Sequence, residues 1–340
     1  MVSLDDVARA AGVSTATASR ALSGRGRSSE ATRERVRAAA EALGYVASAT
    51  ASSLASGRAE NIGVVVALID RWFFARVLDG IASRLAPEGY DITLYNVTDD
   101  PAQRRHLFET SLRRGRVDGL IVLSTPLSDD EVARLGVLDL PIVGLGVPRA
   151  EVDGLRVDDT AVGRAATAHL LALGHRDIAH IGFSVSDESG SDPALDIPTR
   201  RRRGFEQAMA DAPGARARFV AADFTVAGGR QAALDLLAGP NPPTAIFAAS
   251  DELAYGVLQA ARDRGVAVPA DLSVIGVDGH ELAELFDLTT IDQFPHDQGV
   301  RAGDAILAAL GQGTGEPPAA PLPFALVTRG TTAPPLGSNA

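Results

Sequence analysis

Residues 14–20 carry side chains that could read the edges of DNA bases. Thr15 and Ala16 open a short stretch without Pro or Gly, and Arg20 follows one helical turn after Ala16. Arg can bind guanine with two hydrogen bonds, Thr can bond to several bases, and an apolar Ala can contact the thymine methyl. Thr17 and Ser19 add further donors. If this stretch is a helix, these side chains predict that the helix binds a specific DNA sequence in the major groove.

Hydroxyl and guanidinium groups on both sides of this stretch suit contacts with DNA phosphates. They are Ser3, Ser14, Ser19, Ser23, Thr32 and Arg33. Additional positive charge comes from Arg25, Arg27, Arg35 and Arg37. Phosphate contacts position a protein on the duplex without reading its sequence. The alternative for these arginines is plain solvation, and for Arg20 it is solvation or phosphate contact.

Charge is distributed unevenly along the chain. The formal net charge is −11, but residues 1–59 hold eight Arg against five Asp or Glu, a balance of +3. The remaining residues hold 24 basic and 38 acidic side chains, a balance of −14. The overall negative charge alone would argue against nucleic-acid binding. A small basic segment joined to a large acidic remainder is compatible with it, with the basic segment as the part that binds.

The residue inventory offers no catalytic or metal-binding set. The chain has no Cys, which excludes disulfides and thiolate nucleophiles, and no Lys, which excludes a P-loop lysine and a Schiff base. Gly144-Leu-Gly146 lacks the third glycine of a dinucleotide fingerprint. The six His residues do not fall at metal-ligand spacing, and His175 is expected to bind carbonyls at a helix end. We therefore expect no enzyme activity, no metal and no cofactor.

The first 44 residues have the signals of three short helices. Ser3 and Asp6 form a capping box that opens a helix to about residue 11, and Ser14 can cap a second helix over 15–22. A third helix fits residues 29–43, with Gly44 placed to end it. A helix, a short turn with Gly12 and a second helix have the spacing of a helix-turn-helix. Residues 45–60 are small and polar and fit a linker.

From residue 61 the pattern alternates between apolar strands and longer helices. The expected strands are 62–69, 91–96, 119–123, 141–145, 177–183, 218–222, 244–249, 272–277, 289–293 and 324–331. Helical patterns between them include 74–87, 159–173, 199–210, 226–237 and 251–264. This rhythm is typical of parallel α/β sheets, and about 270 residues suffice for two of them. No run approaches the roughly 18 apolar residues of a membrane span, and residues 1–15 are not a signal peptide, so we expect a cytoplasmic protein.

Several ordered motifs resemble those of the lactose-repressor (LacI/GalR) family of transcription regulators. In the head they are Asp6-Val-Ala-Arg-Ala-Ala-Gly-Val-Ser-Thr-Ala-Thr-Ala-Ser-Arg-Ala-Leu22, residues 29–36 and Leu43-Gly-Tyr45. Further along they include Asp118-Gly-Leu-Ile121, Leu173-Gly-His-Arg-Asp-Ile-Ala179, Arg201-x-x-Gly-Phe205, Ser250-Asp-Glu-Leu-Ala254, Ser273-Val-Ile-Gly-Val-Asp278 and Leu288-Thr-Thr-Ile291. The resemblance thus covers nearly the whole chain.

The resemblance implies a head, a hinge and a body. The head would span 1–44 and read bases through Thr15, Ala16 and Arg20. The hinge, 45–60, would become helical on DNA and insert Leu54 into the minor groove. The usual hinge Pro, Asn and Arg are absent here, so we expect fewer polar contacts between the hinge and DNA. The alternative is a plain tether with Leu54 packed on the body. The body, 61–333, would be a periplasmic-binding-protein-like pair of subdomains (61–158 with 292–321, and 159–291 with 322–333), followed by a disordered tail, 334–340.

The resemblance also implies an effector between the subdomains, beyond the carboxyl ends of the strands. The expected contacts are Asp70, Trp72, Phe73, Phe74, Arg201, Phe224, Asp251, Asp278 and Gln293. Alternatives are open: Phe74 could belong to the core, Asp251 could cap a helix, and Trp72 could lie on a dimer face. Carboxylates beside aromatic rings favour a carbohydrate, and Arg201 leaves a phosphorylated or acidic ligand possible.

We therefore predict a homodimeric repressor of near-palindromic operator DNA, controlled by a small effector. The alternative classes are a small-molecule binding protein whose head no longer serves DNA, and a regulator that responds to a nucleobase or a phosphorylated metabolite. The order of the head motifs argues against the first alternative.

Overall fold

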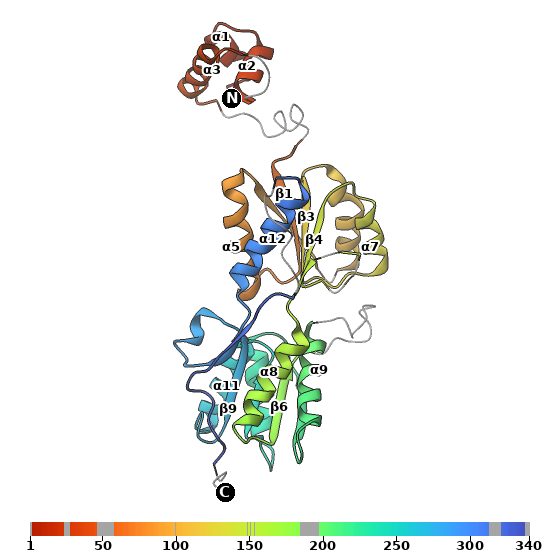
Figure 1. Ribbon diagram of the computed structural model, residues 1–340, viewed down its shortest axis with the longest axis vertical. Helices are drawn as coiled ribbons and strands as arrows, with labels where there is room; N and C mark the ends of the chain where they lie inside the picture. Colours follow the sequence, from red (N-terminus) through yellow and green to blue (C-terminus); the bar gives the residue numbers. More distant parts are fainter. Residues whose placement is uncertain are drawn as a thin grey trace. The chain divides into compact units, whose positions relative to one another are not determined.

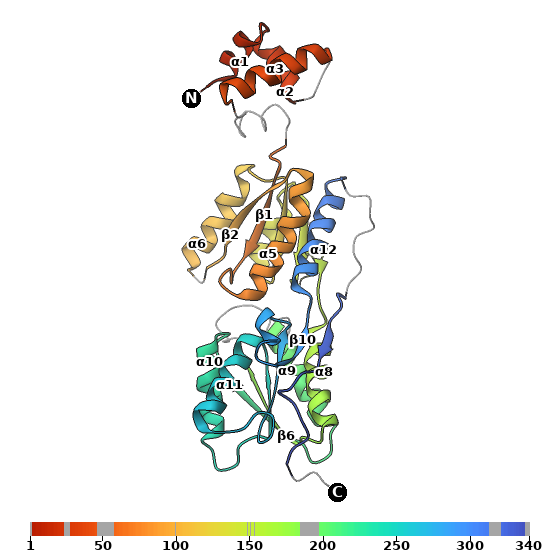
Figure 2. The same cartoon turned by 90° about the vertical axis from the view of Figure 1, so that its left-hand side faces the viewer.

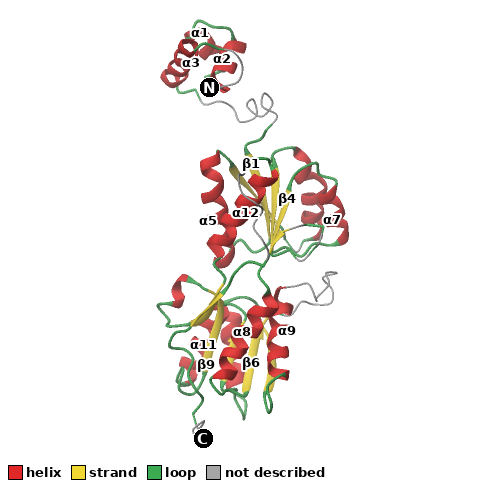
Figure 3. Ribbon diagram, viewed as in Figure 1, coloured by secondary structure: helices red, strands yellow, loops and turns green. Residues whose placement is uncertain are grey.

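The computed structural model describes residues 2–23, 28–45, 58–98, 100–147, 149, 151–152, 154–183, 197–312 and 321–336. The chain forms two compact units, residues 1–61 with 115–118 and the remainder. We call the three described helices of the first unit the head and the second unit the body (Figure 1). In the body, strands lie between layers of helices (Figure 3). No described helix is long and apolar enough to cross a membrane.

The head contains the three expected helices, α1 (Leu4–Ala10), α2 (Thr15–Ser23) and α3 (Glu30–Leu43). The predicted caps are confirmed. Ser3 and Asp6 form the capping box of α1, and the Ser14 hydroxyl accepts from the Thr17 amide at 3.2 Å. Gly44 ends α3 in the left-handed conformation. A small core holds the helices together, and it includes Val7, Ala8, Ala18, Ala21 and Val36. Local capping and a few apolar contacts thus fix the turn that presents α2.

The first sheet of the body has the strand order β2-β1-β3-β4-β5. Its strands are β1 (Asn61–Val66), β2 (Asp91–Asn96), β3 (Gly119–Leu123), β4 (Ile142–Leu145) and β5 (Gly154–Leu155). β1, β3, β4 and β5 are parallel. The helices of this part are α5 (Trp72–Leu85), α6 (Pro101–His106), which continues through turns over Leu107–Ser111 and Leu112–Arg114, α7 (Asp129–Gly136) and α12 (Pro295–Ala309). A short 3₁₀ turn, Ala86–Glu88, follows α5.

The second sheet has the order β11-β10-β9-β8-β6-β7, and only β11 runs antiparallel to its neighbour among the described pairs. Its strands are β6 (Asp177–Gly182), β7 (Arg216–Ala221), β8 (Ala245–Ala248), β9 (Ser273–Asp278), β10 (Thr289–Asp292) and β11 (Ala325–Val327). Its helices are α8 (Asp159–Ala172), α9 (Ile197–Ala210), α10 (Val226–Leu237), α11 (Asp251–Arg264) and a 3₁₀ turn over Glu281–Ala283. The predicted class, a helical head and a two-sheet α/β body, is confirmed.

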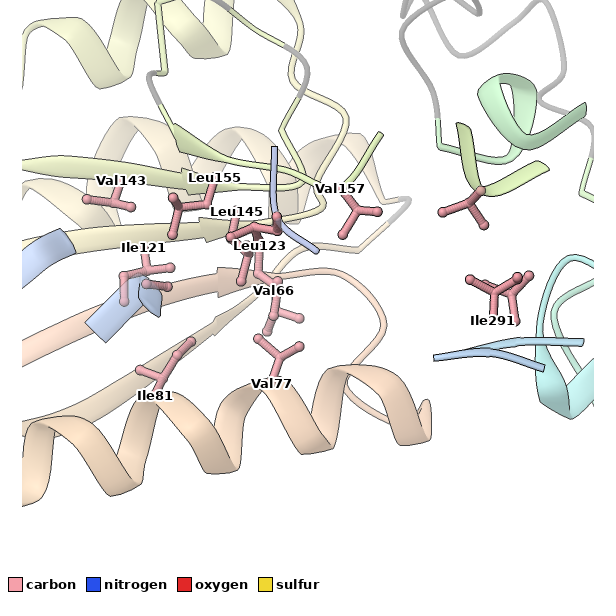
Figure 4. Close-up of a cluster of buried hydrophobic side chains, with 14 of the residues drawn as sticks. Val66, Val77, Ile81, Ile121, Leu123, Val143, Leu145, Leu155, Val157 and Ile291 are labelled. Atoms are coloured by element: carbon pink, nitrogen blue, oxygen red, sulfur yellow. The ribbon is translucent and has the colours of Figure 1, made fainter. Parts of the chain in front are cut away.

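The chain passes between the two sheets three times, because α12 returns to the first sheet between β10 and β11 of the second. Figures 1 and 2 both show α12 beside α5. The helices meet at Gly80 and Gly299, where a Cβ atom would lie 2.0 Å from a carbonyl oxygen of the opposite helix. Next to this contact, the side chains of Val77 and Ile81 point toward the apolar strands of the first sheet (Figure 4).

Two strands end three or more residues before the sequence pattern predicts. β1 ends at Val66, not residue 69, because the chain turns there and the Arg71 amide donates to the Leu68 carbonyl. β11 covers Ala325–Val327, only part of the expected 324–331. The two-residue strand β5 was not expected, since a single pair of residues carries no pattern.

His175 does not bind the end of α8 through its side chain, which corrects our expectation. Its Nδ1 lies 2.9 Å from the Thr244 hydroxyl, and its Nε2 lies 3.0 Å from the Ser273 hydroxyl and 2.9 Å from the Ala333 carbonyl. The Arg176 guanidinium donates to the Leu171 carbonyl at the helix end. His175 is buried because it joins the starts of β8 and β9 to the carboxyl-terminal segment.

Candidate functional site

The expected base-reading residues share one exposed face of α2. Thr15, Ala16 and Arg20 are exposed, whereas Ala18 and Ala21 on the opposite face are fully buried in the head core. Thr17 and Ser19 are half-buried. The Arg20 guanidinium lies 3.5 Å from the Thr17 hydroxyl. The second helix of the motif therefore presents its first turn outward, as a recognition helix does.

Several expected phosphate-binding hydroxyls hold the head together. The Ser3 hydroxyl donates to Asp6 at 2.7 Å, Ser14 caps α2, and the Thr32 and Ser29 hydroxyls lie 2.8 Å apart. Arg33 donates to the Ser28 hydroxyl at 3.0 Å. Leu54, Arg25, Arg27 and the Ser23 side chain lie outside the described residues.

One contact on the exposed face of α2 was not expected. The Thr15 hydroxyl donates to the Asp5 carboxylate of α1 at 2.6 Å, and both residues are exposed. Asp5 had no role in the sequence analysis because only its neighbour Asp6 fits the capping box.

In the body, three of the expected effector residues belong to one buried network. The Arg201 guanidinium donates to the Gln293 side chain at 3.0 Å, and Gln293 in turn donates to Asp278 at 2.8 Å. Arg201 also donates to Asp159 at 2.9 Å and to the Ala249 carbonyl at 2.6 Å. Sequence reasoning missed Asp159, which starts α8 and so looked like an ordinary helix-start acid. We call these five residues the Arg201 network.

Most of the network lies where parallel strands end. Ala249 follows β8, Asp278 is the last residue of β9, and Gln293 follows β10. The carboxyl ends of neighbouring parallel strands lie at one edge of a sheet, which is where open α/β sheets bind ligands.

Asp251 is electrostatically coupled to Asp278 of this network but makes hydrogen bonds of its own. It is fully buried, and its carboxylate accepts from the His280 amide at 2.8 Å and the Thr290 hydroxyl at 2.7 Å. Ser250, not Asp251, caps α11 through the Leu253 amide. Asp251 therefore secures the loop after β9.

Burial changes the ionisation of these acids. It raises the pKa of Asp278 to about 7, although Arg201 acts in the opposite direction. Burial and the nearby Asp278 raise the pKa of Asp251 well above its ordinary value. Burial also raises the pKa of Asp159, and the adjacent Arg201 opposes this effect.

The raised pKa of Asp278 predicts a specific pH dependence of stability. Between about pH 4 and pH 7 the folded protein holds a proton on Asp278 that the unfolded chain has lost, so this group's contribution to stability falls as pH rises through that window. As the pH rises from 5 to 8, the wild type should therefore lose at least about 1 kcal/mol more stability than Asp278→Asn, which has no carboxyl group to titrate at this position. Urea unfolding of both proteins at the two pH values measures the difference. Equal pH dependence in both would contradict the assignment. The comparison also cancels the opposite contribution of buried His180, whose pKa is lowered to about 3.

The remaining expected effector residues lie on the segment after β1 or near it. Asp70 is exposed and pairs with Arg71 at 2.8 Å, while Arg71 donates to the Phe224 carbonyl at 3.1 Å. The Trp72 ring stacks on His280 with centroids 4.3 Å apart. Arg71 was missed because an Arg between Asp and Trp carries no distinctive pattern.

Aromatic rings from both parts of the body complete the set. Phe73 and Phe74 contact each other edge to face and pack against the buried core, which supports the core alternative for Phe74. The Phe224 ring stacks on the ring of exposed Phe183, with the ring centroids 6.2 Å apart. Among the described residues no group of His, Asp and Glu has the arrangement of a metal site.

Comparison with known proteins assigns the family. Residues 3–48 match the bacterial regulatory proteins of the lacI family, and residues 167–332 match a periplasmic binding protein-like domain. The chain is 32% identical to the HTH-type transcriptional repressor PurR of Vibrio campbellii (strain ATCC BAA-1116), over 91% of this chain and 92% of that protein.

Two solved structures are similar over almost the full length. The Lac repressor dimer bound to operator and the anti-inducer ONPF has a TM-score of 0.84 and 28% identity, covering 98% of this chain and 99% of its own. The transcriptional regulator CelR in complex with cellobiose has a TM-score of 0.69 and 28% identity, covering 97% and 100%. With the exposed α2 face and the two-sheet body, these matches show that the chain belongs to the lacI family of bacterial regulatory proteins and is a DNA-binding transcriptional regulator.

Proposed function

We propose that this regulator is a repressor whose operator binding is controlled by a small neutral effector, most simply a carbohydrate, bound at the Arg201 network. The observation that carries the proposal is the set of buried polar groups at the ends of β8, β9 and β10. Burying so many polar groups at one sheet edge is costly unless they are paired, and a hydroxyl-bearing ligand could exchange bonds with them. Such a ligand would control DNA binding only by preferring one conformation of the body over another.

The charges of the network favour a neutral effector. Asp159 already balances the Arg201 guanidinium at 2.9 Å, and Asp278 lies 4.0 Å from it. A phosphorylated ligand would meet more acid than base there. Phe224 and Phe183 offer aromatic faces of the kind that stack on sugar rings, and the cellobiose complex of CelR supports the same class. A nucleobase is the second candidate, since it could also stack there and since PurR repressors are among the relatives.

The effector proposal is tested by a thermal-shift screen of the full chain against monosaccharides, disaccharides, sugar phosphates and nucleobases. A ligand at 100 times its Kd should add about 2.7 kcal/mol to the stability of the folded state. Trp72 is the chain's one Trp and stacks on His280, so its fluorescence gives a second readout of ligand binding. A nucleobase or phosphate hit would overturn the carbohydrate class while leaving the regulator function intact.

The role of Arg20 in base reading gives a direct test of the head. Arg20→Ala should reduce the preference for the selected operator over random DNA by about tenfold or more, because a guanidinium–guanine pair is worth about 1–3 kcal/mol. The operator is first selected from random duplexes with the wild-type protein, and binding is then measured by fluorescence anisotropy.

Arg9→Ala is the matched control for Arg20→Ala, since it removes the same charge from α1, where Arg9 pairs with Asp6. It should leave the sequence preference unchanged. Undiminished operator preference in Arg20→Ala would refute the Arg20 role. Failure of the wild type to select any sequence would favour a small-molecule binding protein without DNA function.

We further propose a homodimer that joins through the segment after β9. Leu282, Leu285 and Phe286 are 40%, 77% and 47% exposed, a concentration of apolar side chains that favours a partner surface. The Lac repressor dimer supports a second copy as that partner. Two heads would then meet two half-sites of a near-palindromic operator.

Leu285→Glu should raise the dimer Kd at least about tenfold, because it places a charge in an apolar contact. Sedimentation equilibrium over a range of concentrations measures the Kd. Val137→Glu, at a residue that is 67% exposed at the end of α7, should change it little. If both variants associate as the wild type does, the interface lies elsewhere.

A further inference from the structure

The Asp5–Thr15 hydrogen bond lies on the surface that the head uses for DNA. Thr15 is the first residue of α2, where a recognition helix meets base edges. Its hydroxyl donates at 2.6 Å to Asp5, in the first turn of α1. Neither helix cap depends on this bond, because Ser3 and Asp6 cap α1 and Ser14 caps α2. The contact is therefore not a cap of either helix, and it lies on the exposed face of α2.

The bond changes what Thr15 can offer to a base. A hydroxyl has one hydrogen, and here that hydrogen points to the Asp5 carboxylate. The pair therefore presents only hydrogen-bond acceptors outward, namely the remaining lone pairs of the hydroxyl and of the carboxylate. Such a site can bind the amino groups of bases, but it repels base edges that carry only hydrogen-bond acceptors.

In the major groove, cytosine offers its N4 amino group and adenine its N6 amino group, whereas guanine and thymine present acceptors at the equivalent places. Adenine also carries the N7 acceptor beside its amino group, so cytosine is the better match to a carboxylate. We propose that Asp5 and Thr15 act together as an acceptor-only reader that selects an amino-bearing base, cytosine first, at one operator position. The inference rests on the proposed base-reading role of α2.

A carboxylate at this surface also has an electrostatic consequence. It repels DNA phosphates, which weakens binding to every sequence and more strongly at low salt. Removing Asp5 should therefore raise affinity for random DNA while reducing selectivity. A purely structural residue would not change these two quantities in opposite directions.

The test is selection from a library of palindromes with randomised half-sites, using the full chain. Wild type should enrich cytosine, or adenine, at one position that depends on Thr15. In Asp5→Ala the Thr15 hydroxyl is free to donate. The preference for cytosine or adenine over guanine and thymine should therefore fall about tenfold at that position and stay unchanged at the others. Asp5→Asn adds an amide donor and should shift the choice toward adenine. Circular dichroism and thermal unfolding check that both variants fold.

Glu41→Ala is the matched control, since it removes one exposed acid from α3 and should alter no position. Thr15→Val identifies the position that Thr15 faces. Guanine or thymine at that position in the wild type would overturn the inference, as would an unchanged profile in a folded Asp5→Ala. Failure of the wild type to enrich any sequence would instead refute the proposed DNA reading by α2.

Discussion

Arg201→Met is expected to lower the free energy of unfolding by about 3–5 kcal/mol, the cost of removing one partner from a buried ion pair. Arg201 is buried, and its guanidinium donates to Asp159, the Ala249 carbonyl and Gln293. Methionine keeps much of the volume but leaves the Asp159 carboxylate buried without its cation. Urea unfolding followed by circular dichroism measures the loss, and effector binding by the variant should be lost as well.

Two further variants separate the network from a general effect on α9. Arg203 is exposed two residues later, so Arg203→Met should change stability by less than about 0.5 kcal/mol. Asp159→Asn should partly restore the stability of Arg201→Met, because it removes the uncompensated charge. A double-mutant cycle with a coupling energy near zero would show that the two side chains do not stabilise each other.

The head was predictable from sequence because its determinants are local. Ser3, Ser14 and Gly44 each act within three or four residues of their own position, so capping patterns locate the three helices. The exposed face of α2 follows from the same spacing. The Asp5–Thr15 bond was not predictable in this way, because it joins two helices across ten residues.

The body shows where such reasoning stops. Alternating strands and helices predicted the two-sheet class, and the resemblance supplied Arg201, Asp278 and Gln293. It did not supply Asp159 or the Ala249 carbonyl, which lie 42 and 48 residues from Arg201. The packing of α12 on α5 depends on residues more than 200 positions apart, and Gly80 and Gly299 carry no local signal of that contact.

That contact gives the second large expected effect. Gly299→Val should lower the free energy of unfolding by about 3 kcal/mol, the upper part of the usual range for overpacking. A Cβ on Gly299 would lie 2.0 Å from the Val77 carbonyl oxygen and 3.0 Å from the Gly80 Cα. Both obstacles are backbone, so no side chain can move aside and α5 and α12 must separate. Thermal and urea unfolding of the full chain measure the change.

Gly136→Ala provides the control, because Gly136 ends α7 without a positive φ, and a Cβ added there would have no neighbour within 4 Å. Alanine there should be neutral or stabilise by up to about 1 kcal/mol, since it restricts the unfolded chain. Wild-type stability in Gly299→Val would mean that α12 can shift on α5 at little cost. Because α12 begins two residues after Gln293, a loss of stability together with weaker effector binding would show that this helix contact also positions the Arg201 network.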